Sequence, residues 1–126
     1  MPIDVERDDR TKRITATGRG TFSPDEVITV LRDLRETNAW DYAVVLDLRF
    51  MTGEPAIRDL TSILQISQDQ RGGSQDTRGL LAIVATNPAL YGMACAYAAL
   101  AKPPGRVSVF RDRPEAELWI ASRTGG

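Results

Sequence analysis

Two short apolar runs, each without a polar residue, constrain the fold of this chain more than any other feature of its sequence. Residues 43–46 read Ala-Val-Val-Leu, and residues 80–85 read Leu-Leu-Ala-Ile-Val-Ala. A strand with one solvated face alternates apolar and polar residues, so unbroken runs predict strands that are covered on both faces. Such strands are typical of the centre of a parallel sheet, in which helical crossovers connect neighbouring strands.

Helix signals lie before and between the two runs. Ser23, Pro24 and Glu26 have the spacing of a capping box with proline in the first turn, which predicts a first helix that ends near Asn38. Pro55 is expected to open a second helix that extends to about residue 70, and residues 71–76 are expected to form a flexible connection. The expected core face of the second helix comprises Ile57, Leu60, Ile63, Leu64 and Ser67.

The last third of the chain adds one strand between two helices. Asn87 can cap a third helix that begins at Pro88 and ends before Pro103. Residues 107–110, Val-Ser-Val-Phe, have the composition of a strand. Asp112 begins a second capping box ahead of a final helix.

The first residues predict a hairpin. Residues 3–18 alternate apolar and polar side chains around a turn at 8–11, as expected for antiparallel strands at the edge of a sheet. The complete order of elements predicts an α/β fold with a mainly parallel central sheet, an N-terminal antiparallel hairpin strand, and helices packed on the sheet. With 126 residues, the chain has room for a single domain over 1–126.

Composition excludes many kinds of chemistry. The chain has no histidine, the commonest general base and metal ligand, and its single cysteine, Cys95, excludes an internal disulfide. We therefore expect a protein that is not an enzyme and has no catalytic residue, metal or cofactor. A net charge of -1 without a basic cluster argues against nucleic-acid binding. Cys95 is expected to be buried within the third helix.

The compartment follows from what the sequence lacks. The N-terminal residues are charged and contain no apolar signal segment. No segment approaches the roughly 20 apolar residues that a membrane-spanning helix needs. We expect a cytoplasmic protein without a membrane span.

One pair of carboxylates could still support chemistry. Asp47 and Glu54 flank the same segment, and two such groups can hold a divalent cation or move a proton. A structural role is favoured for both, because Asp47 at a strand end can accept hydrogen bonds from backbone N–H groups and Glu54 can help to cap the next helix.

Two segments are candidates for binding. The first follows the strand at 43–46, at the edge of the sheet where sites in parallel sheets gather. Its candidate residues, placed on a predicted loop, are Arg49, Phe50, Met51, Thr52 and Glu54. The second is the third helix, which carries no charged residue from 88 to 101, so that a second copy of the chain or a lipophilic ligand would cover it. Its candidate residues are Tyr91, Met93 and Tyr97.

Two stretches carry a resemblance to a known family. Residues 44–48 read Val-Val-Leu-Asp-Leu, and the ending joins Phe110 to Glu115-Ala116-Glu117 and Trp119-Ile120. Together with the order of elements, they resemble the STAS domain superfamily and, more narrowly, its SpoIIAA-like (STAS/SEC14-like) group of small single-domain bacterial proteins. The resemblance covers nearly the whole chain and implies the fold described above. Trp119 is expected to cover the sheet as a core residue.

The resemblance also bears on regulation. Anti-sigma-factor antagonists of this superfamily carry a phosphorylated serine, in an Asp-Ser-Ser-Gly-like motif, at the start of the helix that follows this strand. The corresponding stretch here, residues 54–58, reads Glu-Pro-Ala-Ile-Arg and lacks the serine, and Thr52 lies in a different context. The resemblance therefore implies partner docking without this phosphorylation switch.

These observations lead to two hypotheses. The leading one is a non-catalytic STAS-like module for protein interaction or regulation, which forms a homodimer and binds a protein partner through residues 49–54 or the face of the third helix. The alternative is a binder or carrier of a small lipophilic ligand, as the SEC14-like relatives suggest by name. The pocket expected for that ligand lies between the predicted loop and the third helix, lined by Phe50, Met51, Tyr91, Met93 and Tyr97.

Overall fold

The computed structural model of the chain describes residues 3–69, 79–101 and 105–124. The strands are β1 (Ile3–Asp8), β2 (Arg13–Thr21), β3 (Ala43–Thr52), β4 (Leu81–Val84) and β5 (Val107–Phe110). The helices are α1 (Pro24–Glu36), α2 (Ile57–Asp69), α3 (Pro88–Leu100) and α4 (Arg113–Thr124). The predicted order of elements is confirmed, and the connection expected over residues 71–76 lies outside the described residues. None of the described helices is long and apolar enough to cross a membrane.

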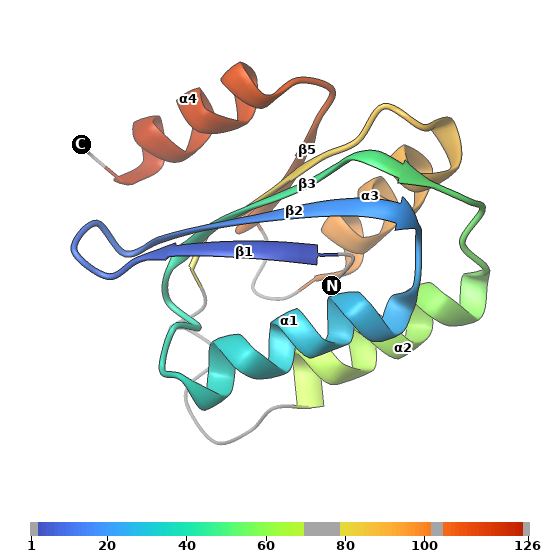
Figure 1. Cartoon of the computed structure of the whole chain (residues 1–126), viewed down its shortest axis with the longest axis horizontal. Helices are drawn as coiled ribbons and strands as arrows, with labels where there is room; N and C mark the ends of the chain where they lie inside the picture. Colours follow the sequence, from blue (N-terminus) through green and yellow to red (C-terminus); the bar gives the residue numbers. More distant parts are fainter. Residues whose placement is uncertain (1–2, 70–78, 102–104, 125–126) are drawn as a thin grey trace.

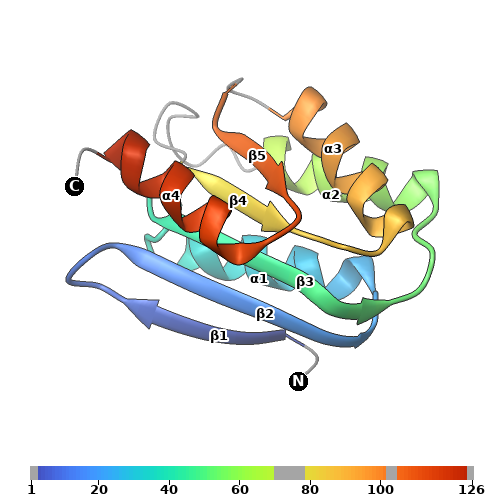
Figure 2. The same cartoon turned by 90° about the horizontal axis from the view of Figure 1, so that it is seen from above.

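The strands form one sheet in the order β1-β2-β3-β4-β5. β1 pairs with β2 in antiparallel orientation, and the other three pairs are parallel. Each crossover therefore advances by one strand in the same direction, which places α1, α2 and α3 on one face of the sheet. α4 follows the last strand and lies on the opposite face (Figures 1 and 2). The predicted α/β class and mainly parallel sheet are confirmed.

β3 shows why an unbroken apolar run belongs in the centre of this sheet. Val44 and Leu46 join the larger core, which lies beneath α1, α2 and α3, and both are buried. Ala43 and Val45 point to the other face and join the smaller core beneath α4. Because successive side chains of a strand point to opposite faces, both sets must be apolar when helices cover both faces.

The smaller core is bordered by charged and aromatic groups. Its apolar residues are Ala43, Val45, Leu80, Ala82, Val84, Ala116 and Ile120. Trp119, predicted as a core residue, is half-buried at the margin, with its ring centroid 5.8 Å from that of Phe110. At another margin, Glu117 of α4 accepts hydrogen bonds from Arg13 of β2 and from Arg113 of α4. α4 is therefore held on the sheet by a modest apolar contact together with the Arg13–Glu117 ion pair, whereas the Arg113–Glu117 pair lies within the helix.

The starts of the helices agree only in part with the caps predicted from the sequence. The Asn87 side chain caps α3 by accepting from the N–H groups of Ala89 and Leu90, at 2.9 and 3.4 Å. Asp112 likewise accepts from the N–H of Glu115, at 2.8 Å. By contrast, Ser23 makes no side-chain hydrogen bond at the start of α1, so the predicted capping box is wrong there.

The start of α2 also differs from the prediction. The helix begins at Ile57 rather than at Pro55, and the Asp59 side chain accepts from the N–H of Ala56 at 2.9 Å. Ile57 lies in the first turn and is 85% exposed, so its predicted place in the core is wrong. Farther along the helix, Ile63 and Ser67 are buried as expected.

Candidate functional site

Most of the residues predicted on the loop after the strand at 43–46 belong to the strand itself, which is β3. The residues expected on that loop and found on the strand are Arg49, Phe50, Met51 and Thr52. β3 continues because its last residues pair in parallel with the end of β2, Phe50 opposite Arg19 and Thr52 opposite Thr21. These side chains are thus held on a paired strand, and Glu54 is exposed just beyond it.

A β-bulge sets the direction of the side chains at this end of β3. The register advances two residues on β2, from Thr17 to Arg19, and three on β3, from Asp47 to Phe50. One extra residue on β3 shifts the alternation of faces, which is what a bulge does in a strand. Met51 consequently enters the larger core and is 2% exposed. It belongs to the interior and not to a surface that a partner could reach.

Gly18 makes room for Met51. A Cβ atom at Gly18 would lie 2.5 Å from the sulfur of Met51, closer than two such atoms approach without a shift. The glycine on β2 therefore serves close packing between the two strands. This contact explains why the residue after Thr17 carries no side chain.

Asp47 anchors Arg49. The Asp47 side chain is fully buried, and the Arg49 guanidinium donates to both of its oxygens, Nε to Oδ1 at 3.0 Å and Nη2 to Oδ2 at 2.8 Å. Burial acts to raise the pKa of Asp47, but the hydrogen bonds from the side chain and backbone of Arg49 outweigh it and hold this pKa below its usual range. Asp47 thus accepts a backbone N–H, as predicted, and also fixes a guanidinium.

Phe50 stands between two guanidinium groups. Its side chain is 49% exposed, and Cζ of Arg19 and Cζ of Arg49 each lie 5.1 Å from its ring centroid. We call Arg19, Arg49 and Phe50 the Phe50 surface. In Figure 2, the tip of β3 extends beyond α4. The arrangement offers an exposed ring and two cations in fixed positions, chemistry suited to contact with another molecule.

α3 turns a narrow apolar stripe to the core. Leu90, Ala94 and Tyr97 are its buried residues, and they follow one another at helical spacing. Cys95 falls outside this stripe and is exposed, so the prediction that it is buried is wrong. Together with exposed Gly92 it forms part of an uncharged outer face, which we define as the α3 surface by the residues Gly92, Cys95 and Ala99.

The aromatic candidates of α3 have different environments. Tyr97 is buried, whereas Tyr91 is half-buried beneath Arg111, whose Cζ lies 4.2 Å from its ring centroid. Within the described parts of the chain, no group of three or more histidine, cysteine or acidic side chains could hold a metal ion. The groups brought together around the sheet ends are thus arginine and aromatic side chains.

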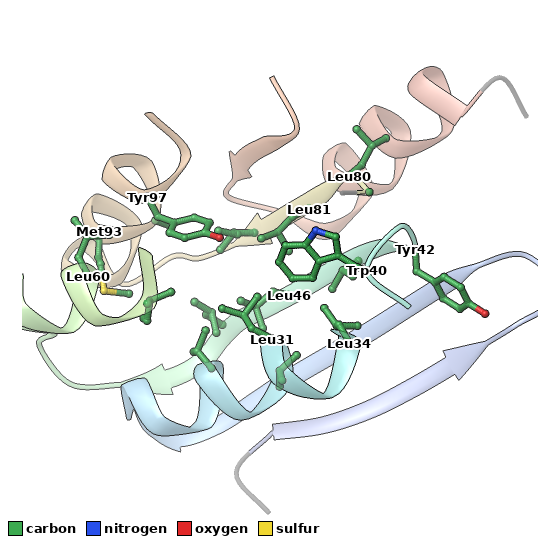
Figure 3. Close-up of a pocket in the computed structure, with 18 of the residues that line it drawn as sticks. Leu31, Leu34, Trp40, Tyr42, Leu46, Leu60, Leu80, Leu81, Met93 and Tyr97 are labelled. Carbon is green, nitrogen blue, oxygen red and sulfur yellow. The ribbon is translucent and has the colours of Figure 1, made fainter. Parts of the chain in front are cut away.

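An apolar cavity lies between the helices and the sheet, beneath α1, α2 and α3. It offers about 60 Å³ to the centres of water-sized molecules. Met93 and Tyr97 line it, whereas the other three residues of the predicted pocket, Phe50, Met51 and Tyr91, do not. The pocket expected between loop and helix is therefore replaced by a cavity farther inside the fold. Its walls include Leu31, Leu34, Trp40, Leu46, Leu60 and Leu81 (Figure 3).

Sequence reasoning missed most of the cavity lining. The apolar residues of α1 form a stripe that the sequence shows, and this stripe faces the cavity. Nothing in the spacing of Trp40, after the end of α1, indicated that its ring would form a wall (Figure 3). A space between elements depends on how helices rest on the sheet, which a one-dimensional pattern does not contain.

Comparison with known proteins identifies the fold. No protein-family model matches the chain, and no curated protein matches its sequence. Among solved structures, it is similar to an uncharacterized protein from the DUF3478 family with a SpoIIAA-like fold, from Shewanella loihica PV-4. The TM-score is 0.59 at 14% sequence identity, over 94% of this chain and 91% of that one. The fold is therefore SpoIIAA-like, as the resemblance implied.

Proposed function

We propose that this SpoIIAA-like domain is a non-catalytic, STAS-like interaction module that binds a protein partner through the Phe50 surface. The observation that carries the proposal is a half-exposed aromatic ring held between two guanidinium groups on a paired strand. Aromatic and arginine side chains dominate the energetics of protein interfaces. Because Asp47 and the strand pairing already fix Arg49 and Phe50, little side-chain entropy is lost when a partner binds.

The start of α2 supports docking without the family's phosphorylation switch. The stretch from Glu54 to Arg58 contains no hydroxyl side chain. The nearby Thr52 lies on β3, and its hydroxyl donates to the carbonyl of Gly20 at 3.5 Å. We place this docking function in the cytoplasm, as the sequence predicts, and expect a partner that offers carboxylates and an apolar pocket to the Phe50 surface.

Affinity capture from an extract of the native cell, with two matched variants, tests the proposal. Phe50→Ala removes the exposed ring, while Leu118→Ala removes a similarly exposed apolar side chain (70%) from α4. The expected result is a partner that binds wild type and Leu118→Ala and is reduced at least about tenfold with Phe50→Ala. Equal capture by all three proteins would show that the partner uses another surface.

The proposed homodimer uses the α3 surface. α3 has no charged residue, and the residues that define the α3 surface, Gly92, Cys95 and Ala99, are small, so two copies could pack closely through it. A two-fold contact there would bring the two Cys95 residues near each other. We expect a dimer by light scattering, efficient Cys95 cross-linking by a short bifunctional maleimide, and loss of both with Ala99→Arg. A monomer at high concentration would contradict the dimer.

The cavity favours a second candidate function, the binding of a small lipophilic molecule. A concave space lined by apolar side chains is the usual form of a site for such a ligand. Extraction of the purified protein with organic solvent, followed by mass spectrometry, tests for a compound carried from the cell. A protein that carries none and binds no apolar probe would lack this function.

A further inference from the structure

We infer that the cavity beneath α1, α2 and α3 selects a compact, uncharged apolar molecule no larger than a single six-membered ring. This inference rests on the second candidate function and adds the class of ligand. It follows from three features of the cavity: its size, its lining and the placement of its polar atoms.

The size of the cavity limits the ligand. The volume open to the centres of water-sized molecules is about 60 Å³. An engineered apolar cavity of about 150 Å³ accepts benzene or xenon. The space here is smaller, so its occupant is at most about one ring in size, and a ring enters only if the walls adjust.

The lining excludes a charged group. Within the described chain, no residue that lines the cavity carries a charge. Burying a carboxylate or phosphate without a partner is strongly unfavourable, because the ion loses its hydration. The ligand must therefore be uncharged where it lies inside the protein.

The lining side chains that carry a nitrogen or oxygen atom are those of Trp40, Tyr42 and Tyr97. The hydroxyl of Tyr42 donates to Asp9 at 2.7 Å, so it is already engaged away from the cavity. The Trp40 ring is covered by the Arg35 guanidinium, whose Cζ lies 3.9 Å from the ring centroid. Figure 3 shows Tyr42 at one end of the group of lining side chains, with Trp40 nearer its middle, beside Leu81 and Leu46. A ligand in the middle would meet leucine side chains and aromatic rings.

The opposite end of the cavity has an adaptable wall. Met93 and Leu60 lie together there in Figure 3, and both are half-buried. Methionine is unbranched and changes rotamer at low cost, so it can adjust to rings of slightly different shape. This end is the expected route of entry.

Methyl NMR of the complete chain, titrated with benzene, xenon, benzoate and 1-octanol, tests the inference. We expect benzene and xenon to shift the methyl signals of Leu46 and Leu81, which line the cavity, and to leave Ile120 unshifted on the other face. Benzoate should give no shift, since its carboxylate would be buried unpaired. Binding of benzoate as tight as that of benzene, or binding of 1-octanol but not benzene, would overturn the inferred ligand class while leaving the second function in place. If no probe shifts these methyl groups, both fail.

Variants give an independent test. Ala94 lines the cavity, so Ala94→Leu should fill it and weaken benzene binding by about tenfold or more. The matched control, Ile120→Val, lies in the other core and should leave the affinity unchanged. Should Ala94→Leu not fold, Met93→Ala enlarges the same space and should bind p-xylene more tightly than wild type does. Equal affinities in all variants would overturn the inference.

Discussion

The two faces of the sheet are closed in different ways. Beneath α1, α2 and α3 lies an extensive apolar core that reaches from Ile3 of β1 to Val107 of β5 and contains the cavity. Beneath α4 lies a small apolar cluster, flanked by the pair of buried Asp47 and half-buried Arg49 and by the ion pairs of Glu117. The helices on one face are held by burial of apolar side chains, and the helix on the other face is held by apolar burial together with ion pairs.

The difference separates the core that supplies most of the stability from the surface that is proposed to bind a partner. Burial of apolar surface supplies most of the free energy of folding, and the larger core has most of that surface. The face of α4 leaves the end of β3 uncovered, where charged and aromatic side chains remain open to a partner. Variants that alter one face at a time therefore test whether the two faces differ in this way.

The largest expected effect comes from deleting a buried side chain on each face. Leu90 and Ile120 are both almost fully buried, in the larger and smaller core respectively. Leu90→Ala should lower the free energy of unfolding by about 3–4 kcal/mol in urea denaturation, and Ile120→Ala by about 2–3 kcal/mol. Hydrogen exchange should show Ile120→Ala exposing amides of α4 while those of α1 to α3 stay protected. A global loss of protection in both variants would mean that the faces unfold as one unit.

A smaller effect is expected from Trp119→Ala. A fully buried tryptophan costs about 3–5 kcal/mol when truncated, but Trp119 is half-buried beside Phe110, so we expect about 2 kcal/mol. The change should again be concentrated in α4. Thermal and urea unfolding of the variant measure this loss of stability. A loss larger than that of Leu90→Ala would mean that the face beneath α4 contributes more to stability than the larger core.

The smallest expected effect is the loss of folding stability at acidic pH. Burial acts to raise the pKa of both Asp47 and Glu117, yet hydrogen bonds from Arg49 and from Arg13 outweigh it and lower both. A carboxyl group with a lowered pKa in the folded state stabilises the fold above its unfolded pKa, near 4, and loses this contribution as pH falls through the folded value. Stability should therefore decline below about pH 4.

Asp47→Asn isolates this contribution. We expect the variant to lose about 1.5 kcal/mol at pH 7, the low end of the range of about 1.5–3 kcal/mol for a hydrogen bond to a charged group, because Arg49 is partly exposed. It should differ less from wild type as the pH falls below 4. Urea unfolding at several pH values measures this difference. A constant difference at every pH would contradict the role assigned to the Asp47 charge.

The sequence was informative where burial alone decides structure. The runs at 43–46 and 80–85 predicted central strands, because only residues covered on both faces can be uniformly apolar. The caps of α3 and α4 were also predictable, since each depends on a few consecutive residues, such as Asn87 and the two that follow it.

Prediction failed where distant segments decide structure. β3 extends to Thr52 because the end of β2 pairs with it, and no local propensity shows that partner. Cys95 is exposed because of how α3 is rotated on the sheet, although its neighbours in sequence are apolar. For the candidate site, the sequence pointed to Arg49 and Phe50 but could not show that Arg19, some thirty residues earlier, stacks on the same ring.

The order of the strands has a consequence for synthesis. Because spatial order follows chain order, each strand that leaves the ribosome meets a neighbour that has already been made. The far side of β3 and β4, with Val45 and Val84, stays uncovered until α4, the last element, arrives. A chain that stops before α4 would expose this strip to chaperones and to aggregation, and the pairing of Arg13 with Glu117 joins an early strand to the final helix.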